Sequence, residues 1–305
     1  MKFTNMKALK VYNKEIQKLK IALTSACSLR CLHCNIDKEA NKEIKPEYAL
    51  RAVDMLIQSE GKYKRLELYG GEPLLRFNLV KDIFEYAYHK AKCNDKKISL
   101  SIATNATVIN DEIIKWLKEN KINISISFCG SAKSHNLLRK FPDGRGSYDL
   151  VFKNIKKIIS LLDPDYVVCL YCVDNAFVEN MINDFHKIIS IGFKVINIEC
   201  AHGRGWTKEG YALLRDNMKE ILRTIDENIA KGKFIFMESF IEMMRRKKLE
   251  KIVCPVYRDM EVYPDGGIGF YPYAFVNYEK QKGEIVIGNC LEGIRKRYRK
   301  CYFSS

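Results

Sequence analysis

Residues 20–34 of the chain read KIALTSACSLRCLHC. The first five residues form the short apolar run that is typical of a buried strand. Three cysteines follow at spacings of four and three residues, and they are Cys27, Cys31 and Cys34. Thiolates are soft ligands that suit iron–sulfur clusters, and a loop allows three sulfurs to converge on one cluster. Three protein ligands would leave one iron open to a cosubstrate.

The same spacing also allows a zinc site, with His33 as the fourth ligand. Zinc sites of this kind usually pair two short motifs, and no second motif of suitable spacing lies nearby. The chain has 11 cysteines. Its first 20 residues are polar and Lys-rich and do not have the apolar core of a secretory signal. We therefore expect a reducing, cytoplasmic location, where cysteines bind metals or perform chemistry more often than they form disulfides.

A strand followed by a helix recurs along the first two thirds of the 305 residues. The predicted strands are 20–24, 65–69, 98–103, 122–128, 166–172 and 194–199. The predicted helices are 46–61, 77–92, 110–119, 147–161, 176–190 and 207–231. This alternation predicts an α/β fold with a parallel sheet and right-handed crossovers. Six units are too few for a closed eight-unit barrel, so we expect an open, partial (β/α)6 TIM-like barrel with its chemistry at the carboxyl ends of the strands.

The pattern changes after Glu199. A further helix is predicted at 237–249, and the turn residues PDGG at 264–267 predict a hairpin between strands 260–263 and 268–271. A short strand at 284–288 and a basic helix at 291–300 complete the prediction. The predicted organisation is an N-terminal extension (1–18), the partial barrel (19–205), and a helical linker with a small α+β C-terminal subdomain (206–305).

Polar motifs stand at the ends of the predicted strands. The second strand ends in Gly70-Gly71-Glu72-Pro73, where glycines allow close backbone approach and a carboxylate suits an ammonium group. The third ends in Thr104-Asn105. The fourth ends in SISFCG (125–130) and leads to His135, Arg139 and DGRGSY (143–148). Taken singly, each motif could equally be a turn, a strand-end hydrogen bond or a surface charge.

Taken in order, these motifs resemble those of the radical S-adenosylmethionine superfamily over about residues 19–200. Residues 125–148 resemble the branch that contains anaerobic sulfatase maturases and peptide-modifying enzymes with a SPASM or twitch C-terminal region. The resemblance implies one [4Fe–4S] cluster on the three loop cysteines and bound S-adenosylmethionine. The implied cofactor-binding residues are Gly70, Gly71, Glu72, Pro73, Thr104, Asn105, Ser127 and Arg139. The segment Gly203-Arg204-Gly205 is also common in this branch, although it reads equally well as a hinge.

Two departures from the pattern concern cysteines. In the C-terminal region of the branch, cysteines often bind auxiliary clusters, but here Tyr271 stands at one expected cysteine and only Cys254, Cys290 and Cys301 remain. We expect a degenerate region without an auxiliary cluster, and a three-cysteine cluster is the alternative. Cys129 stands where the branch usually has Asp, and Cys200 ends the sixth strand. Both are candidate hydrogen-atom donors, or else small buried hydrophobes.

The resemblance implies reductive cleavage of S-adenosylmethionine to a 5′-deoxyadenosyl radical, which removes a hydrogen atom from the substrate. We expect a ribosomally synthesised precursor peptide that is crosslinked, epimerised or oxidised. An electron donor such as flavodoxin or ferredoxin, and a separate leader-binding protein, are the expected partners. The alternatives are a small-molecule enzyme such as a twitch-type dehydrogenase, and protein oxidation as in sulfatase maturases.

The formal net charge of +15 would attract acidic partners. Its simplest explanation is a Lys-rich solvated surface, because the basic residues are mostly scattered. A non-catalytic iron–sulfur protein that binds nucleic acid is the reading with the least support, since only the charge favours it. No apolar run reaches the roughly 18 residues of a membrane span, so no membrane partner is expected.

Overall fold

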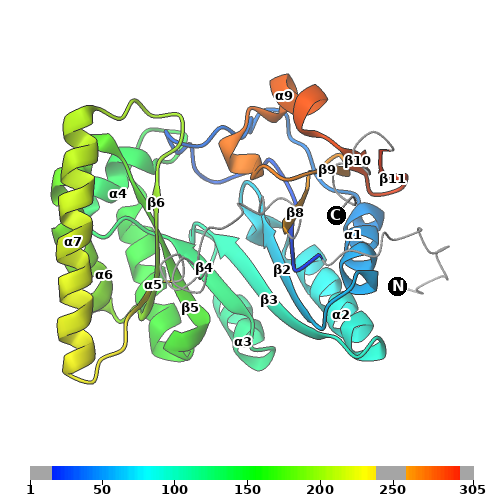
Figure 1. Ribbon diagram of the computed structural model, residues 1–305, viewed down its shortest axis with the longest axis horizontal. Helices are drawn as coiled ribbons and strands as arrows, with labels where there is room; N and C mark the ends of the chain where they lie inside the picture. The colour runs from blue at the N-terminus through cyan, green and yellow to red at the C-terminus, as the bar shows by residue number, and fades with distance from the viewer. Residues whose placement is uncertain (1–15, 238–258, 296–305) are drawn as a thin grey trace, which may run out of the picture. The chain divides into compact units, whose positions relative to one another are not determined.

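The computed structural model describes residues 16–237 and 259–295. Among these residues the chain forms two compact units, and both contain parallel strands connected by helices (Figure 1). Unit 1 comprises residues 16–26, 35–101 and 259–295. Unit 2 comprises residues 27–34 and 102–237. The cysteine loop therefore belongs to unit 2, although it directly follows a strand of unit 1.

Unit 1 is built around β1 (Lys18–Ala22), which lies between two parallel neighbours. One neighbour is β2 (Tyr63–Tyr69), and the other is β8 (Asp259–Val262) from the C-terminal part of the chain. Helices α1 (Pro46–Gln58) and α2 (Phe77–Cys93) pack against each other, and α1 also contacts β1 and β2. Pro46 occupies the first position of α1, where its missing N–H costs no hydrogen bond.

The C-terminal part of unit 1 continues from β8 as a series of short antiparallel strands. They are β9 (Gly267–Gly269), β10 (Gly288–Asn289) and β11 (Gly293–Ile294). The hairpin prediction is confirmed. Between β9 and β10 lie a 3-10 turn (Tyr273–Phe275) and helix α9 (Tyr278–Ile285).

Two predictions for this part of the chain are wrong. The predicted strand at 284–288 covers the end of α9, and β10 begins only at Gly288. The predicted helix at 291–300 is replaced in its described part by a turn and β11, because Gly293 has a φ of +78° and reverses the chain. Its remaining residues lie outside the described ranges.

Unit 2 contains parallel strands in the order β4–β5–β6–β7. Their bounds are β4 (Asn123–Ser127), β5 (Val167–Val173), β6 (Val195–Cys200) and β7 (Phe236–Met237). Strand β3 (Lys97–Thr104) enters this unit at residue 102. The helices are α3 (Asp111–Glu119), α4 (Ala132–Leu138), α5 (Tyr148–Leu161), α6 (Met181–Ile191) and α7 (Lys208–Ala230). Helix α7 packs along α6 (Figure 1).

The six predicted strands are all confirmed within a few residues. The helix predicted at 176–190 divides into a 3-10 stretch (Asn175–Asn180) and α6, because Phe177 departs from helical dihedrals. Met237 ends β7 instead of opening a helix, and the rest of that predicted helix lies outside the described residues. No helix among the described residues is both long and apolar enough to cross a membrane. The predicted domain boundaries at 18/19 and 205/206 stay predictions.

The strands of unit 2 carry two different faces. Along β4 and β5, buried residues alternate with part-exposed ones, as the strand period requires. The part-exposed face carries Ser125 and Ser127 on β4, and Leu170 and Cys172 on β5. Ser127 and Leu170 are partners in the ladder, so Cys172 lies on the face of Ser127, one pleat further along. This face is the accessible wall at the carboxyl ends of the strands.

Candidate functional site

The cysteine loop is held by the segment that follows α4. Backbone amides of Arg30 and Leu32 donate to the carbonyls of Lys140 and Leu138, at 2.7 Å and 2.9 Å. The two bonds pair residues in opposite chain directions, so Cys31 lies opposite Arg139. Arg30 and Leu32 are exposed and Cys31 is part-exposed, whereas Leu138 and Arg139 are buried.

Arg139 brings a buried positive charge to the loop. Its side chain is 6% exposed, and its Nη1 lies 3.9 Å from Cys31 Sγ. Its Nε has no hydrogen-bond partner in the protein, and no described carboxylate pairs with it. A buried guanidinium keeps its charge and is costly without an anion. The arrangement therefore suits an anionic group beside Cys31, such as a thiolate-bound cluster or a ligand carboxylate.

Asn105 supports the loop from the end of β3. Its side-chain Nδ2 donates to Cys27 Sγ at 3.4 Å and to Ser28 Oγ at 3.2 Å. The backbone amide of Leu29 also donates to Cys27 Sγ, at 3.4 Å. N–H groups that point at sulfur favour the thiolate and tune cluster potentials. Thr104 instead accepts from the amide of Ala106 at 3.0 Å and shapes the turn.

These contacts fit an iron–sulfur cluster. All three loop cysteines are part-exposed, and N–H donors reach Cys27 and Cys31. Within residues 16–237 and 259–295, no three ligating side chains converge closely enough for a single metal ion. The zinc alternative with His33 stays a prediction, and the N–H donors to the loop sulfurs are the observation that favours a cluster.

His135 and Ser147 form the scaffold behind Arg139. The imidazole is fully buried, and its Nδ1 accepts from the amide of Cys129 at 3.4 Å. Its Nε2 lies 3.1 Å from Ser147 Oγ, and that hydroxyl donates to the carbonyl of Arg139 at 2.9 Å. Burial holds the pKa of His135 well below its usual value, so the ring is neutral and donates from Nε2. Ser147 is the N-cap residue of α5, but its hydroxyl makes no capping bond to the helix.

The two predicted hydrogen-atom donors have different environments. Cys129 is fully buried, and its thiol donates to the carbonyl of Cys172 at 3.6 Å. Cys200 is exposed at the end of β6, where it is the ladder partner of Val173 and so faces away from Cys172. Burial raises the pKa of both thiols, and for Cys200 the neighbouring Glu199 adds to the effect.

Cys172 was not among the candidate hydrogen-atom donors that the sequence suggested. This residue is part-exposed on the same face of the sheet as Ser127. Burial raises the pKa of Cys172 to about 12, so its sulfur carries a hydrogen at neutral pH. The period-two alternation of β5 was the signal that could have found it.

The Gly-Gly-Glu motif belongs to unit 1 and fits closely against the chain before Cys27. The amide of Gly71 donates to Thr24 O at 2.7 Å, and the amide of Glu72 donates to Ala26 O at 2.9 Å. The buried Glu72 carboxylate accepts from Leu74 N at 3.1 Å and caps the 3-10 helix Pro73–Arg76. The motif thus holds residues 24–26, which connect β1 to the cysteine loop.

The C-terminal part of unit 1 has a tyrosine core. The rings of Tyr263, Tyr273 and Tyr278 pack with centroids 4.5–6.0 Å apart, and Tyr278 Oη donates to Asp265 at 2.7 Å. Cys290 is fully buried nearby, and burial raises its pKa to about 12. Cys254 and Cys301 lie outside the described residues. The expectation of no auxiliary cluster stays a prediction.

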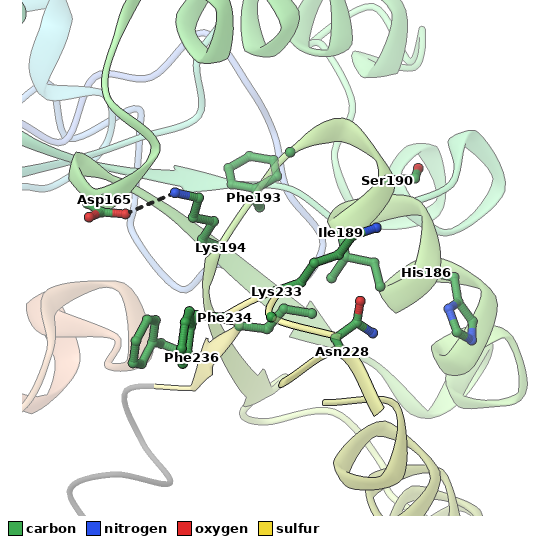
Figure 2. A pocket seen from close by; sticks show the side chains of 13 residues that line it. Asp165, His186, Ile189, Ser190, Phe193, Lys194, Asn228, Lys233, Phe234 and Phe236 are labelled. Carbon is green, nitrogen blue, oxygen red and sulfur yellow. Dashed lines mark hydrogen bonds and ion pairs between the residues drawn. The ribbon is translucent and has the colours of Figure 1, made fainter. Parts of the chain in front are cut away.

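Unit 2 also has a cavity of about 1010 Å³ near the amino ends of β6 and β7 (Figure 2). Phe193, Phe234 and Phe236 line it, together with Lys194, which pairs with Asp165 at 3.4 Å. Ser127, Cys172 and the cysteine loop lie at the other ends of the strands and are not among its lining residues. The cavity therefore does not form part of the thiol-bearing site.

Fold and site together define a class: a parallel α/β protein with a three-thiolate loop after its first strand. The Radical SAM superfamily model matches residues 21–189, and the chain belongs to this family. It is 34% identical over 212 residues to "Uncharacterized protein MJ0907" of Methanocaldococcus jannaschii, covering 68% of this chain and 69% of that one.

Two characterised relatives differ in the substrates that their names imply. A GTP 3′,8-cyclase of Clostridium botulinum is 26% identical over 66% of this chain and 62% of its own. A cysteine-type anaerobic sulfatase-maturating enzyme of Clostridium novyi is 30% identical over 44% of this chain and 37% of its own. The chain thus spans less than two thirds of the length of both enzymes.

Solved structures show the same fold. The enzyme anSMEcpe with bound AdoMet and the Cp18Cys peptide has a TM-score of 0.74 and 18% identity, covering 93% of this chain and 80% of that one. SuiB of Streptococcus suis bound to its precursor peptide SuiA has a TM-score of 0.61 and 16% identity, covering 96% and 66%. The expected radical SAM fold is therefore confirmed.

Proposed function

We propose that this radical SAM enzyme acts on a ribosomally synthesised peptide and uses the loop of Cys27, Cys31 and Cys34 to hold its single [4Fe–4S] cluster. The observation that carries the proposal is the buried Arg139 beside Cys31, which provides a cation at an accessible thiol loop. When bound, a reduced cluster with S-adenosylmethionine supplies a 5′-deoxyadenosyl radical. The remaining chemistry falls to this chain's own residues.

Those residues have separate roles in the proposal. Asn105 donates to Cys27 and tunes the cluster. Arg139 and Ser127 bind the carboxylate end of S-adenosylmethionine, while Glu72 and its glycines bind the amino group. His135 and Ser147 position Arg139 through its backbone. Thr104 and Pro73 act by shaping the turns that present these groups.

The thiols near β4–β6 are candidate hydrogen-atom donors. A protonated thiol can return a hydrogen atom to a substrate carbon radical, which inverts the carbon without net oxidation. The thiyl radical then needs one electron and one proton, which the enzyme's electron donor and solvent supply. Cys172 joins Cys129 and Cys200 as a candidate because it combines accessibility with a raised pKa.

Support for a peptide comes from two structural neighbours that bind peptides, anSMEcpe and SuiB, and these neighbours share only the fold at 16–18% identity. A small-molecule substrate is the second candidate, favoured by the 26% identity to GTP 3′,8-cyclase. The cytoplasmic location, the separate leader-binding protein and the catalytic part at 19–205 are further parts of the proposal.

The test is anaerobic reconstitution with iron and sulfide, followed by S-adenosylmethionine and a strong reductant. We expect about four irons per chain and 5′-deoxyadenosine in the product, both lost in Cys31→Ala. Addition of GTP, or of small peptides encoded beside the gene, then separates the two substrate classes. A fully loaded cluster that makes no 5′-deoxyadenosine with either substrate class would contradict the proposal.

Incubation in D₂O identifies the hydrogen donor, since thiols exchange their hydrogen with solvent. Without substrate, a thiol close to the radical should pass deuterium to 5′-deoxyadenosine. We expect this label to disappear in one of Cys129→Ala, Cys172→Ala and Cys200→Ala while 5′-deoxyadenosine formation continues. Label that persists in all three would exclude these thiols as donors.

A further inference from the structure

The outer side of the cysteine loop is an exposed apolar and basic surface. Leu32, between two predicted cluster ligands, is 54% exposed, and Leu137 at the end of α4 is 39% exposed. Arg30 is exposed and Lys140 is part-exposed beside them. We call these four residues the loop face. Single exposed leucines are common, but two beside a cofactor loop and flanked by basic residues indicate a contact surface.

Two backbone hydrogen bonds hold this face beside the predicted cluster ligand Cys31. Arg30 and Leu32 are the chain neighbours of Cys31, and Lys140 is the neighbour of Arg139. Arg139 is buried with its Nη1 3.9 Å from Cys31 Sγ, while Arg30 and Leu32, on either side of Cys31 in the chain, are exposed. One residue of backbone therefore separates a sulfur that would bind iron from the surface of the molecule.

We propose that the loop face docks an acidic one-electron carrier protein that reduces the cluster. This inference rests on the proposed function, because it assumes that the loop cysteines hold the cluster. Electron transfer rates fall steeply with distance, so a donor must approach the cluster closely. Leu32 and Leu137 supply the apolar centre that such a contact needs, and Arg30 and Lys140 supply a basic rim.

Charge complementarity selects an acidic partner. The chain carries a formal charge of +15, so its field attracts a negatively charged carrier over long range. The basic residues of the loop face then orient the carrier. Contacts of this kind act mainly on association rates and weaken with salt. A transient donor needs this behaviour, since it must leave after each electron.

The loop face can be altered without touching the cluster ligands. Leu32 and Lys140 contribute only backbone atoms to the two hydrogen bonds that hold the cysteine loop. The test variant is therefore Leu32→Glu/Lys140→Glu. Its matched control is Leu161→Glu/Lys118→Glu, which makes the same charge change at the exposed ends of α5 and α3.

The experiment uses the full, iron-loaded chain and a reduced flavodoxin as the probe. Stopped-flow absorbance follows cluster reduction, first by flavodoxin and then by photoreduced deazariboflavin, which is small and needs no docking surface. We expect the loop-face variant to lower the flavodoxin rate constant about tenfold at low salt and to flatten its salt dependence. Iron content and reduction by deazariboflavin should match those of the wild type and the control.

The outcomes separate this inference from the proposed function. Wild-type chain that binds no cluster, or makes no 5′-deoxyadenosine after deazariboflavin reduction, refutes the proposed function itself. Normal 5′-deoxyadenosine formation with equal flavodoxin rates in both variants refutes the docking surface alone. If the double variant loses iron, Lys140→Glu is measured instead, with a smaller decrease expected. A variant that changes only the KM of an added peptide would assign the face to the substrate and overturn the inference.

Discussion

Gly71 provides the most direct test of how the second strand fixes the cysteine loop. A Cβ built at this position would lie 2.2 Å from Ala26 O and 2.6 Å from Ser25 O. This is about 1 Å or more short of ordinary van der Waals contact. Both contacts are backbone atoms, so no side-chain rotation can relieve the overlap. Gly71→Ala must therefore displace residues 24–26, which lead directly to Cys27.

The energetic cost follows from the contacts that the shift disturbs. Overpacking costs about 1–3 kcal/mol, and weakening the bonds from Gly71 N and Glu72 N adds about 1 kcal/mol each. We expect the free energy of unfolding to fall by about 3–5 kcal/mol and Tm to fall by about 5–15 °C. Because Cys27 moves with the displaced backbone, iron content after reconstitution should fall as well.

The measurements are thermal unfolding and iron content per chain. The control is Gly283→Ala, because Gly283 lies in helix α9 and its Cβ would meet nothing within 4 Å. That change should leave iron content unaltered and raise stability by about 0.5–1 kcal/mol. A Gly71→Ala protein with wild-type Tm and full iron would refute the close approach of these two backbones.

Three further predictions concern single side chains. Asn105→Ala removes an N–H donor from Cys27 and should lower the midpoint potential of the cluster, measured by redox titration, while leaving iron content intact. Ser147→Ala leaves the buried His135 Nε2 and the Arg139 carbonyl without this hydroxyl and should cost about 1–3 kcal/mol in urea unfolding, with Ser147→Thr recovering part. Burial raises the pKa of Glu261 to about 7 from 4.5, so the folded chain keeps a proton that the unfolded chain releases between these values. Stability should therefore decline by up to about 3 kcal/mol as pH rises through that window, and the decline should be absent in Glu261→Gln.

The fold was predictable where its signal is local. Each of the six long strands carries its own apolar pattern and ends at a polar motif, and all six are present. The failures involve short elements whose local sequence signal is weak. Strand β11 has two residues and exists because it pairs with β10. Helix α9 was missed because Gly283 lowers the helix propensity of the segment, and because its many charged residues leave little apolar periodicity.

The site was predictable as a set of residues but not as an arrangement. The motifs identify Asn105 and Arg139, and the structure brings both to sulfurs of the cysteine loop. The antiparallel register that pairs Cys31 with Arg139 depends on hydrogen bonds between segments about 110 residues apart, which no local pattern encodes. For the same reason, the sequence could not show that Ser147 bonds to His135 instead of capping its helix.

Unit 2 divides its cysteines by environment, and this division explains which of them are suited to iron. Cys27 and Cys31 receive N–H groups from Asn105 and from the cationic Arg139, and such donors favour the thiolate that metals require. Cys169 and Cys172 sit in a desolvated strand, where burial raises the pKa of each and keeps the hydrogen on sulfur. A thiolate can ligate iron, whereas a protonated thiol can give up a hydrogen atom. The proposed chemistry therefore assigns metal binding to thiols that receive N–H donors, and hydrogen-atom transfer to a thiol whose pKa burial raises.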